Sequence, residues 1–230
     1  GIIRLDGEEL QLRNPMEAQN LGIAAIYQHV TSYPDLTVAE NIFMGHEKVK
    51  KLTGRIDWKE MHSQAQALLD QLDANFDSRE RMNSLSVARQ QIVEIAKALS
   101  TNARVIIMDE PTAALTQHES EELYRITDGL REAGKAVIFI SHRMEDIWRL
   151  ADRVTVFRDG KHIGCWDVGE IDQEKLIVAM VGREISQMYP KRNVEIGEEL
   201  LRVEHLTRIG FFRDVSFDVK AGEIVALTGL

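Results

Sequence analysis

The sequence predicts an α/β domain whose sheet is largely parallel. Short runs of branched apolar residues alternate with segments in which apolar residues recur at helical spacing. This alternation is typical of parallel strands, because each pair needs a long crossover connection that is usually a helix. The 230 residues, 44% apolar and 28% charged, can bury a substantial core, which excludes a disordered or fibrous chain.

Composition narrows the class of protein further. No apolar run approaches the roughly 18 residues of a membrane span, and we expect no secretory signal in GIIRLDGEEL. The one cysteine, Cys165, excludes an internal disulfide framework, favours a reducing cytosol and fits a small apolar residue in a strand. The formal charge of -9 disfavours a broad surface for nucleic-acid phosphates, although a local basic patch stays possible.

The first half of the chain is expected to hold one strand followed by an inserted helical subdomain at about residues 34–100. The strand is predicted in IAAIYQHV, and Gln28 follows it. A helix is predicted at residues 57–74, because five apolar side chains share one helical face: Met61, Ala65, Leu68, Leu69 and Leu72. Another helix is predicted at residues 86–100.

The second half is expected to continue with a strand, a helix and a strand. The branched runs Val105–Met108 and Val137–Ile140 predict the two strands, and Val154–Phe157 predicts a further one. Between the first two, Thr116 and Glu119 have the spacing of a capping box that starts a helix. Its inward stripe is formed by Leu123, Ile126 and Leu130.

A change of composition divides the chain near residue 183. Residues 183–199 are polar and contain glycine, which is typical of a linker. After them, LLRVEHLTR, DVSFDV and EIVALTGL are strand-like. We therefore expect a first domain at residues 1–182, a linker at 183–199 and the start of a second domain at 200–230.

Two adjacent carboxylates, Asp109 and Glu110, follow the predicted strand in RVIIMDEPTAALT. Adjacent carboxylates repel one another, so the pair suggests a cation or a reacting group nearby. The carboxyl ends of strands in open α/β sheets bind ligands, so Asp109 could hold hydrated magnesium while Glu110 activates a water. Taken alone, such a pair more often only caps the following turn.

The order of several motifs favours the catalytic interpretation. IAAIYQHV, LSVARQQIVEIAKAL, VIIMDEPTAAL and VIFISHRMEDI follow one another along the chain. In this order they resemble the nucleotide-binding subunits of ABC transporters over essentially the whole sequence. The resemblance implies a P-loop NTPase-like core with an inserted helical subdomain, and it implies ATP and Mg²⁺ as ligands.

The resemblance also implies roles for four residues. Gln28 is similar to the glutamine that senses magnesium and the nucleophilic water, and Asp109 and Glu110 match the metal ligand and the base. His142 resembles the switch histidine that contacts the terminal phosphate. Without its motif, His142 would be interpreted as an ordinary hydrogen-bonded histidine.

Two further segments depart from the family pattern. Ser86 should begin a helix and direct its hydroxyl and backbone N–H groups toward an anion. Most members continue with two glycines and a glutamine, where this chain has Val87, Ala88 and Arg89. Side chains add bulk where backbone approaches phosphate, so we expect an altered and slower composite site. The turn expected at the dimer interface comprises Ala113, Ala114, Leu115 and Thr116, and Thr116 replaces a frequent aspartate.

A phosphate loop is not found in the expected place. GLREAGKA, residues 129–136, matches the Walker A spacing, but it should close a helix and precede a strand, and Ala136 replaces the Ser or Thr that ligates magnesium. The family places Walker A before the segment GIIRLDG and again after VKAGEIVALTGL. We therefore expect a piece of a longer protein with two fused nucleotide-binding domains, and no ATPase activity from this piece alone.

The tandem design resembles the fused ATPases of bacterial monosaccharide importers of the ribose, galactose, xylose and arabinose type. The resemblance implies a peripheral protein on the cytoplasmic face of the membrane. Its permease would contact Tyr33–Gly45, a sugar-binding protein would be an indirect partner, and no nucleic acid is expected. Two alternatives are a soluble ABC-type ATPase acting on DNA or ribosomes, and a regulatory module that binds nucleotide without turnover.

Overall fold

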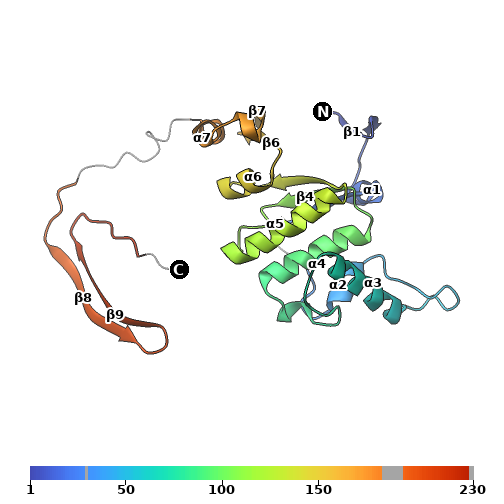
Figure 1. Ribbon diagram of the computed structural model, residues 1–230, viewed down its shortest axis with the longest axis horizontal. Coiled ribbons are helices and arrows are strands. Elements are labelled where there is room, and N and C mark those ends of the chain that lie inside the picture. The colour runs from blue at the N-terminus through green and yellow to red at the C-terminus, as the bar shows by residue number, and fades with distance from the viewer. Residues whose placement is uncertain (29–30, 183–193, 228–230) are drawn as a thin grey trace. The chain divides into compact units, whose positions relative to one another are not determined.

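The computed structural model describes residues 1–28, 31–182 and 194–227 (Figure 1). The chain divides into two compact units, Gly1–Gln173 and Glu174–Leu230. In the described ranges, no helix has the length and apolar character needed to cross a membrane. Residues 183–193 of the predicted linker lie outside these ranges, so the division at 182 and 200 stays a prediction.

The first unit is built on a parallel sheet of three strands (Figure 1). β4 (Val105–Asp109) lies between β3 (Ile23–Ile26) and β5 (Ala136–Ile140). In the register, Met108 lies opposite Ile26 on one side and Phe139 on the other. The predicted parallel sheet is confirmed, and so are its three strands.

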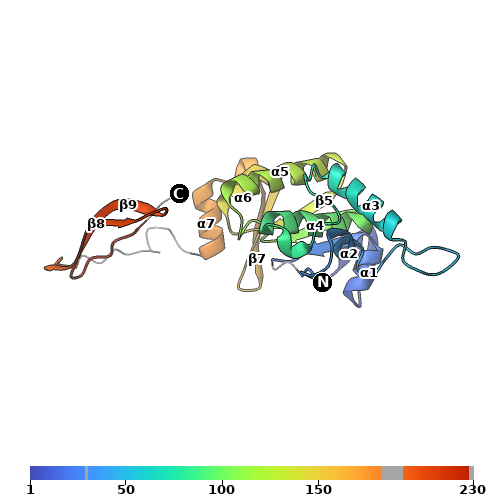
Figure 2. The same ribbon diagram turned by 90° about the horizontal axis from the view of Figure 1, so that it is seen from below.

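Helices cover one face of this sheet. α4 (Val87–Ser100) and α5 (Gln117–Glu132) lie side by side, as Figures 1 and 2 show. Because successive side chains of a strand point to opposite faces, Ile106 and Met108 of β4 lie on the covered face, and both are fully buried. On the other face, Ile138 and Ile140 of β5 are 51% and 46% exposed. The apolar face of the edge strand is therefore open to solvent within the described residues.

The inserted helical subdomain is confirmed. It contains α2 (Val38–Phe43), α3 (Trp58–Gln71), the short 3-10 helix η1 (Met82–Ser84) and α4. A capping box that the sequence analysis did not single out, Thr37 with Glu40, starts α2. The predicted stripe of α3 packs into the core, with Met61, Ala65, Leu69 and Leu72 buried and Leu68 partly buried against it.

The starts of α4 and α5 also agree with the sequence. Ser86 is the N-cap of α4 and accepts a hydrogen bond from the Arg89 N–H. Thr116 is the N-cap of α5, and both hydrogen bonds of its capping box with Glu119 are present. The residues predicted to face inward on α5 are buried: Leu123, Ile126 and Leu130.

Smaller elements complete the first unit. β1 (Ile3–Leu5) and β2 (Glu8–Leu10) form one antiparallel pair, and β6 (Arg153–Arg158) and β7 (Lys161–Asp167) form another. The remaining elements are helical: α1 (Pro15–Asn20), α6 (Met144–Leu150) and η2 (Val168–Glu170). Cys165 lies in β7 as predicted, but it is exposed.

The second unit contains most of α7 (Gln173–Val181) and the antiparallel pair of β8 (Glu199–Arg208) and β9 (Phe212–Lys220). The two strands match LLRVEHLTR and DVSFDV. The strand predicted in EIVALTGL is wrong for residues 223–227, which have no regular structure. A strand needs a hydrogen-bonded neighbour, and here Ile224 is 98% exposed, with no strand paired to this segment in the described part of the unit.

Candidate functional site

Three segments of the first unit converge on the carboxylate of Glu110. Asp109 lies opposite Ile140 in the sheet, so the residues that follow β4 and β5 leave the sheet at the same edge. The side-chain amide of Gln28, which follows β3, donates a hydrogen bond of 3.0 Å from Nε2 to Oε2 of Glu110. His142 Nδ1 lies 2.9 Å from Oε1 of Glu110. Both oxygens of the carboxylate are therefore oriented by side chains.

The protonation of His142 decides the character of its contact with Glu110. The imidazole is 65% exposed and the carboxylate is 28% exposed, so solvent weakens any ion pair between them. A neutral imidazole that donates to Glu110 from Nδ1 has Nε2 as an acceptor. A protonated imidazole donates from both nitrogens. In either state Nδ1 orients the carboxylate, and Nε2 is not used in this contact.

The backbone of Glu110 adopts a conformation that side chains disfavour. Its φ is +45°. The other six non-glycine residues with positive φ in the described ranges are Asp, Asn or His, which tolerate this region better: Asp6, Asp73, Asn102, Asp159, His205 and Asp214. The conformation is held by a hydrogen bond of 2.9 Å from the Glu110 N–H to the Ile140 carbonyl. Strain of this kind is concentrated at functional sites.

Asp109 and Gln28 together present oxygen atoms suited to a hard cation. Asp109 ends β4, is half-buried, and in the described ranges its carboxylate makes no hydrogen bond or ion pair. Gln28 uses Nε2 toward Glu110, so its Oε1 is left as an acceptor. No group of three or more His, Cys, Asp and Glu side chains in these ranges could enclose a metal. The donor set fits Mg²⁺, which keeps several waters and needs few protein ligands.

The segment that starts α4 lies in the helical subdomain. Ser86 is exposed, and its hydroxyl accepts from the Arg89 N–H at 3.4 Å, so it caps the helix as predicted. Val87 is 45% exposed, whereas Ala88 is 6% exposed. The Arg89 guanidinium lies 5.7 Å from the centre of the Phe76 ring. Only Val87 and Arg89 therefore add side-chain bulk to the exposed start of the helix, because the methyl group of Ala88 is buried.

The predicted interface turn lies between Glu110 and α5. Ala113 and Ala114 are exposed, while Leu115 is partly buried and packs against the hydrophobic core. Thr116 donates its hydroxyl to Glu119 Oε2 at 2.8 Å and is used as a helix cap. The turn therefore presents two alanines to solvent and anchors its other end in the domain.

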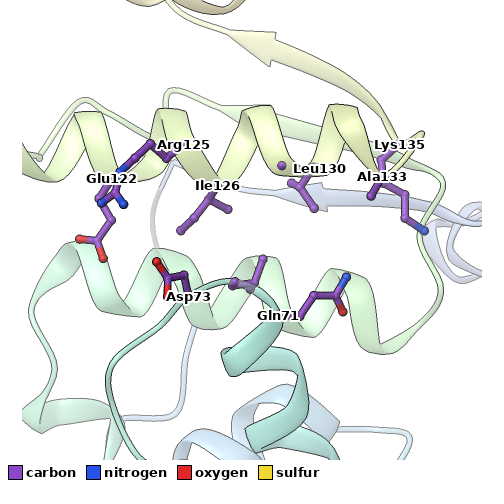
Figure 3. Close-up of a pocket in the computed structure, with 10 residues that line it drawn as sticks. Gln71, Asp73, Glu122, Arg125, Ile126, Leu130, Ala133 and Lys135 are labelled. Carbon is purple, nitrogen blue, oxygen red and sulfur yellow. The ribbon is translucent and has the colours of Figure 1, made fainter.

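The GLREAGKA segment is confirmed as the end of a helix. Gly129 lies in the last turn of α5, Gly134 has a φ of +75° just after it, and β5 starts at Ala136. Lys135 lies at one end of a groove of about 400 Å³ between α5 and the end of α3 (Figure 3). None of the residues that line this groove belongs to the predicted site.

A buried carboxylate next to the site was not predicted. Asp146, in the first turn of α6, is fully buried and accepts hydrogen bonds from the hydroxyls of Thr112, Tyr124 and Ser141. Asp146 lies four positions after His142. A charged residue in a first helical turn is usually solvated, so the local sequence carries little signal for this buried contact. Only the pattern of hydroxyl residues beside the catalytic motifs could have indicated it.

Known proteins resemble this chain in sequence and in fold. A family model described as "ABC transporter" matches residues 1–113. The chain is therefore similar to ABC transporter ATP-binding domains. The ABC cassette fold is also found in an ATP-binding cassette of an ABC transporter solved in its ADP conformation, with a TM-score of 0.64 and 22% identity over 77% of this chain and 75% of that one. A cassette bound to ADP and Pi in a post-hydrolysis state gives a TM-score of 0.59 with 24% identity, over 73% of each chain.

Relatives of this chain include proteins named for sugar import. The ribose import ATP-binding protein RbsA of Geobacillus kaustophilus is 49% identical over all 230 residues, which make up 47% of that protein. A putative ribose/galactose/methyl galactoside import ATP-binding protein of Agrobacterium fabrum is 46% identical over the same span, 45% of its length. The chain therefore spans about half the length of the curated relatives it matches.

Proposed function

We propose that this chain is part of a longer ABC protein that binds and hydrolyses ATP to drive the import of a monosaccharide through a membrane permease. The observation that carries the proposal is the carboxylate of Glu110, held between Gln28 and His142 at the end of an ABC-type sheet. The relatives named for ribose import, at 49% identity, support the sugar class.

In this proposal Glu110 is the general base for the attacking water. Gln28 and His142 orient its two oxygens, and Nε2 of His142 is left to contact the terminal phosphate. Asp109 and the Oε1 atom of Gln28 would hold Mg²⁺, directly or through water. When bound, the ion neutralises charge on the phosphates and so lowers the cost of hydrolysis.

The phosphate-binding elements would come from another part of the longer protein. The exposed side chains Ile138 and Ile140 support this, because the sheet face next to Asp109 is apolar and open in the described residues. Parallel sheets are normally covered on both faces. We propose that a segment carrying Walker A covers this face, that residues 183–199 link two nucleotide-binding domains, and that the second begins near residue 200.

The segment Tyr33–Gly45 is the proposed contact with the permease. It contains α2, whose side chains Val38, Ile42 and Phe43 are buried, and it presents Tyr33, which is 53% exposed. The protein would bind peripherally to the cytoplasmic face of the membrane, and an extracellular sugar-binding protein would be an indirect partner. No nucleic acid is needed as a ligand.

The segment of Ser86, Val87 and Arg89 is proposed to close over ATP bound to the opposite domain. Ser86 would contribute its hydroxyl and the start of α4 would contribute backbone N–H groups. The bulk of Val87 and Arg89 predicts slower hydrolysis at this composite site than at its twin. Equal rates at the two sites, measured separately, would remove this part of the proposal.

The replacement of Glu110 tests the proposed base directly. In the full-length protein that contains this chain, Glu110→Gln should leave ATP binding intact and lower kcat by roughly 10²–10⁴-fold, the usual contribution of a general base. Glu132→Gln is the matched control, since Glu132 is an exposed carboxylate in the last turn of α5. ATP binding by fluorescence titration and phosphate release by a colorimetric assay give the two readouts. Undiminished hydrolysis by the Glu110 variant would contradict the assignment.

A further inference from the structure

Asp146 joins three segments of the first unit through one buried carboxylate. Oδ2 accepts hydrogen bonds of 2.6 Å from the Thr112 hydroxyl and 2.6 Å from the Ser141 hydroxyl. Oδ1 accepts a hydrogen bond from the phenol of Tyr124 on α5. Asp146 is 0% exposed. Burying a carboxylate costs free energy unless its oxygens accept hydrogen bonds. The three hydroxyl donors supply these bonds and hold the Asp146 side chain in place.

Two of the three donors are next to the residues of the proposed active site. Thr112 is two residues after Glu110, and Ser141 immediately precedes His142. Both hydroxyls donate to Oδ2 of Asp146. This one oxygen therefore connects the segment that carries Glu110 to the segment that carries His142. The contact of 2.9 Å between Glu110 and His142 forms between these two segments.

Arg143 adds a second connection between the same segments. Its backbone N–H donates to the Ser141 hydroxyl at 3.0 Å, and its Nη1 donates to the Thr112 carbonyl at 3.1 Å. The Ser141 hydroxyl thus accepts one hydrogen bond and donates another, which uses its proton and directs it at Asp146. The network leaves little freedom for either turn to move alone.

Tyr124 provides the comparison within the same network. Its hydroxyl bonds to Asp146 from the middle of α5, a helix that lies outside both catalytic turns. Burial, followed by the hydrogen bond to Asp146, raises the pKa of this phenol, so it stays protonated and donates throughout the physiological range. Loss of this donor affects the same carboxylate but leaves the Thr112 and Ser141 contacts in place.

We propose that Asp146 is a positioning residue for ATP hydrolysis, which holds the Glu110 and His142 turns in register through the hydroxyls of Thr112 and Ser141. The inference rests on the proposed function. Asp146 touches neither nucleotide nor water in this role; it fixes the backbone from which the base and the histidine act. A displacement of about 1 Å in such a group can cost about 100-fold in rate.

The test measures kcat and KM for ATP in the full-length protein, together with the midpoint of thermal unfolding. Asp146→Leu keeps a similar volume but has no accepting oxygen, so the Thr112 and Ser141 hydroxyls both lose their bonds to this position. We expect kcat to fall by roughly ten- to a hundred-fold and KM to change by less than about two-fold. Thr112→Val should lower kcat in the same direction, while Thr112→Ser, which keeps the hydroxyl, should restore it.

Tyr124→Phe is the matched control, because it removes one hydroxyl from the same carboxylate without touching either catalytic turn. It should lower the unfolding midpoint about as much as Thr112→Val does. Its kcat should stay within about two-fold of the wild-type value, because no interaction made in the transition state is removed. Equal kcat losses in the Tyr124 and Thr112 variants would overturn the proposal, since the network would then act through stability alone. If Asp146→Leu does not fold, the comparison of Thr112→Val with Thr112→Ser decides.

A second measurement does not depend on turnover. NMR of the histidine side chains in the full-length protein, with His142 assigned by its loss in His142→Gln, reports the hydrogen bond at Nδ1. This signal should shift in Thr112→Val and stay unchanged in Tyr124→Phe; no shift in either variant would count against a positioning role. A wild-type protein without ATPase activity, or full activity in Glu110→Gln, would instead refute the proposed function.

Discussion

Ser86 combines a structural role with a proposed functional role, and two substitutions separate them. Its hydroxyl accepts from the Arg89 N–H at 3.4 Å, at the long end of the range for a hydrogen bond. Replacing a serine N-cap with alanine costs about 0.5–2 kcal/mol, and the long distance places Ser86→Ala near the lower end, about 0.5–1 kcal/mol. Ser86→Asp should cap the helix as well as serine does, because aspartate ranks beside serine at this position.

The two substitutions should therefore separate helix stability from ATP-driven domain association. Ser86→Asp should keep the stability of the wild type, yet its negative charge should repel the terminal phosphate and suppress the ATP-driven association of the two domains. Ser86→Ala should lose stability and retain part of this association.

Amide hydrogen exchange in the first turn of α4 measures the cap, and ATPase assays of the full-length protein measure the function. A loss of protection in Ser86→Asp equal to that in Ser86→Ala would refute the capping argument. Wild-type hydrolysis by Ser86→Asp would refute the phosphate contact.

Two further predictions concern stability and can be checked by urea unfolding. Burial raises the pKa of Glu94 above its ordinary value of 4.5, so the folded state binds this proton more tightly than the unfolded state, and stability falls as pH rises through that raised pKa. Glu94→Gln should therefore stabilise the protein at pH 7 and lose this advantage in acid, and an equal effect at both pH values would contradict the argument. Leu69→Ala in α3 should cost about 2–5 kcal/mol because the side chain is fully buried. The control Leu52→Ala, at a side chain that is 100% exposed, should cost almost nothing.

The helices predicted at residues 86–100 and after Thr116 were placed closely because their start signals are local. The capping box of Thr116 with Glu119 and the N-cap at Ser86 are formed by residues within one turn of each other, so the chain carries the information for each start. The strands of the parallel sheet were recognisable from their branched runs. The segment at residues 223–227 has the same composition, yet it forms no strand, because composition cannot supply the neighbour to which a strand must bond.

The candidate site was predictable in its members but not in its contacts. Asp109 and Glu110 were recognised from their place at the end of an apolar run, and Gln28 and His142 from the order of the motifs. Sequence gave no sign of the positive φ of Glu110, since glutamate has no preference for that region. Nor did it indicate Asp146, whose burial depends on three hydroxyls from other segments.

By itself, the sequence determined where helices begin, which runs form the parallel sheet, and which strand end carries the acidic pair, since each depends on residues close together in the chain. The tertiary structure decided which of these residues meet. Gln28 lies 82 positions from Glu110, and His142 lies 32 positions from it, yet both bind its carboxylate. Their meeting depends on the parallel register of β3, β4 and β5, which brings three strand ends to one edge. Contacts of this kind arise from strand pairing across the sheet, and local spacing along the chain does not encode them.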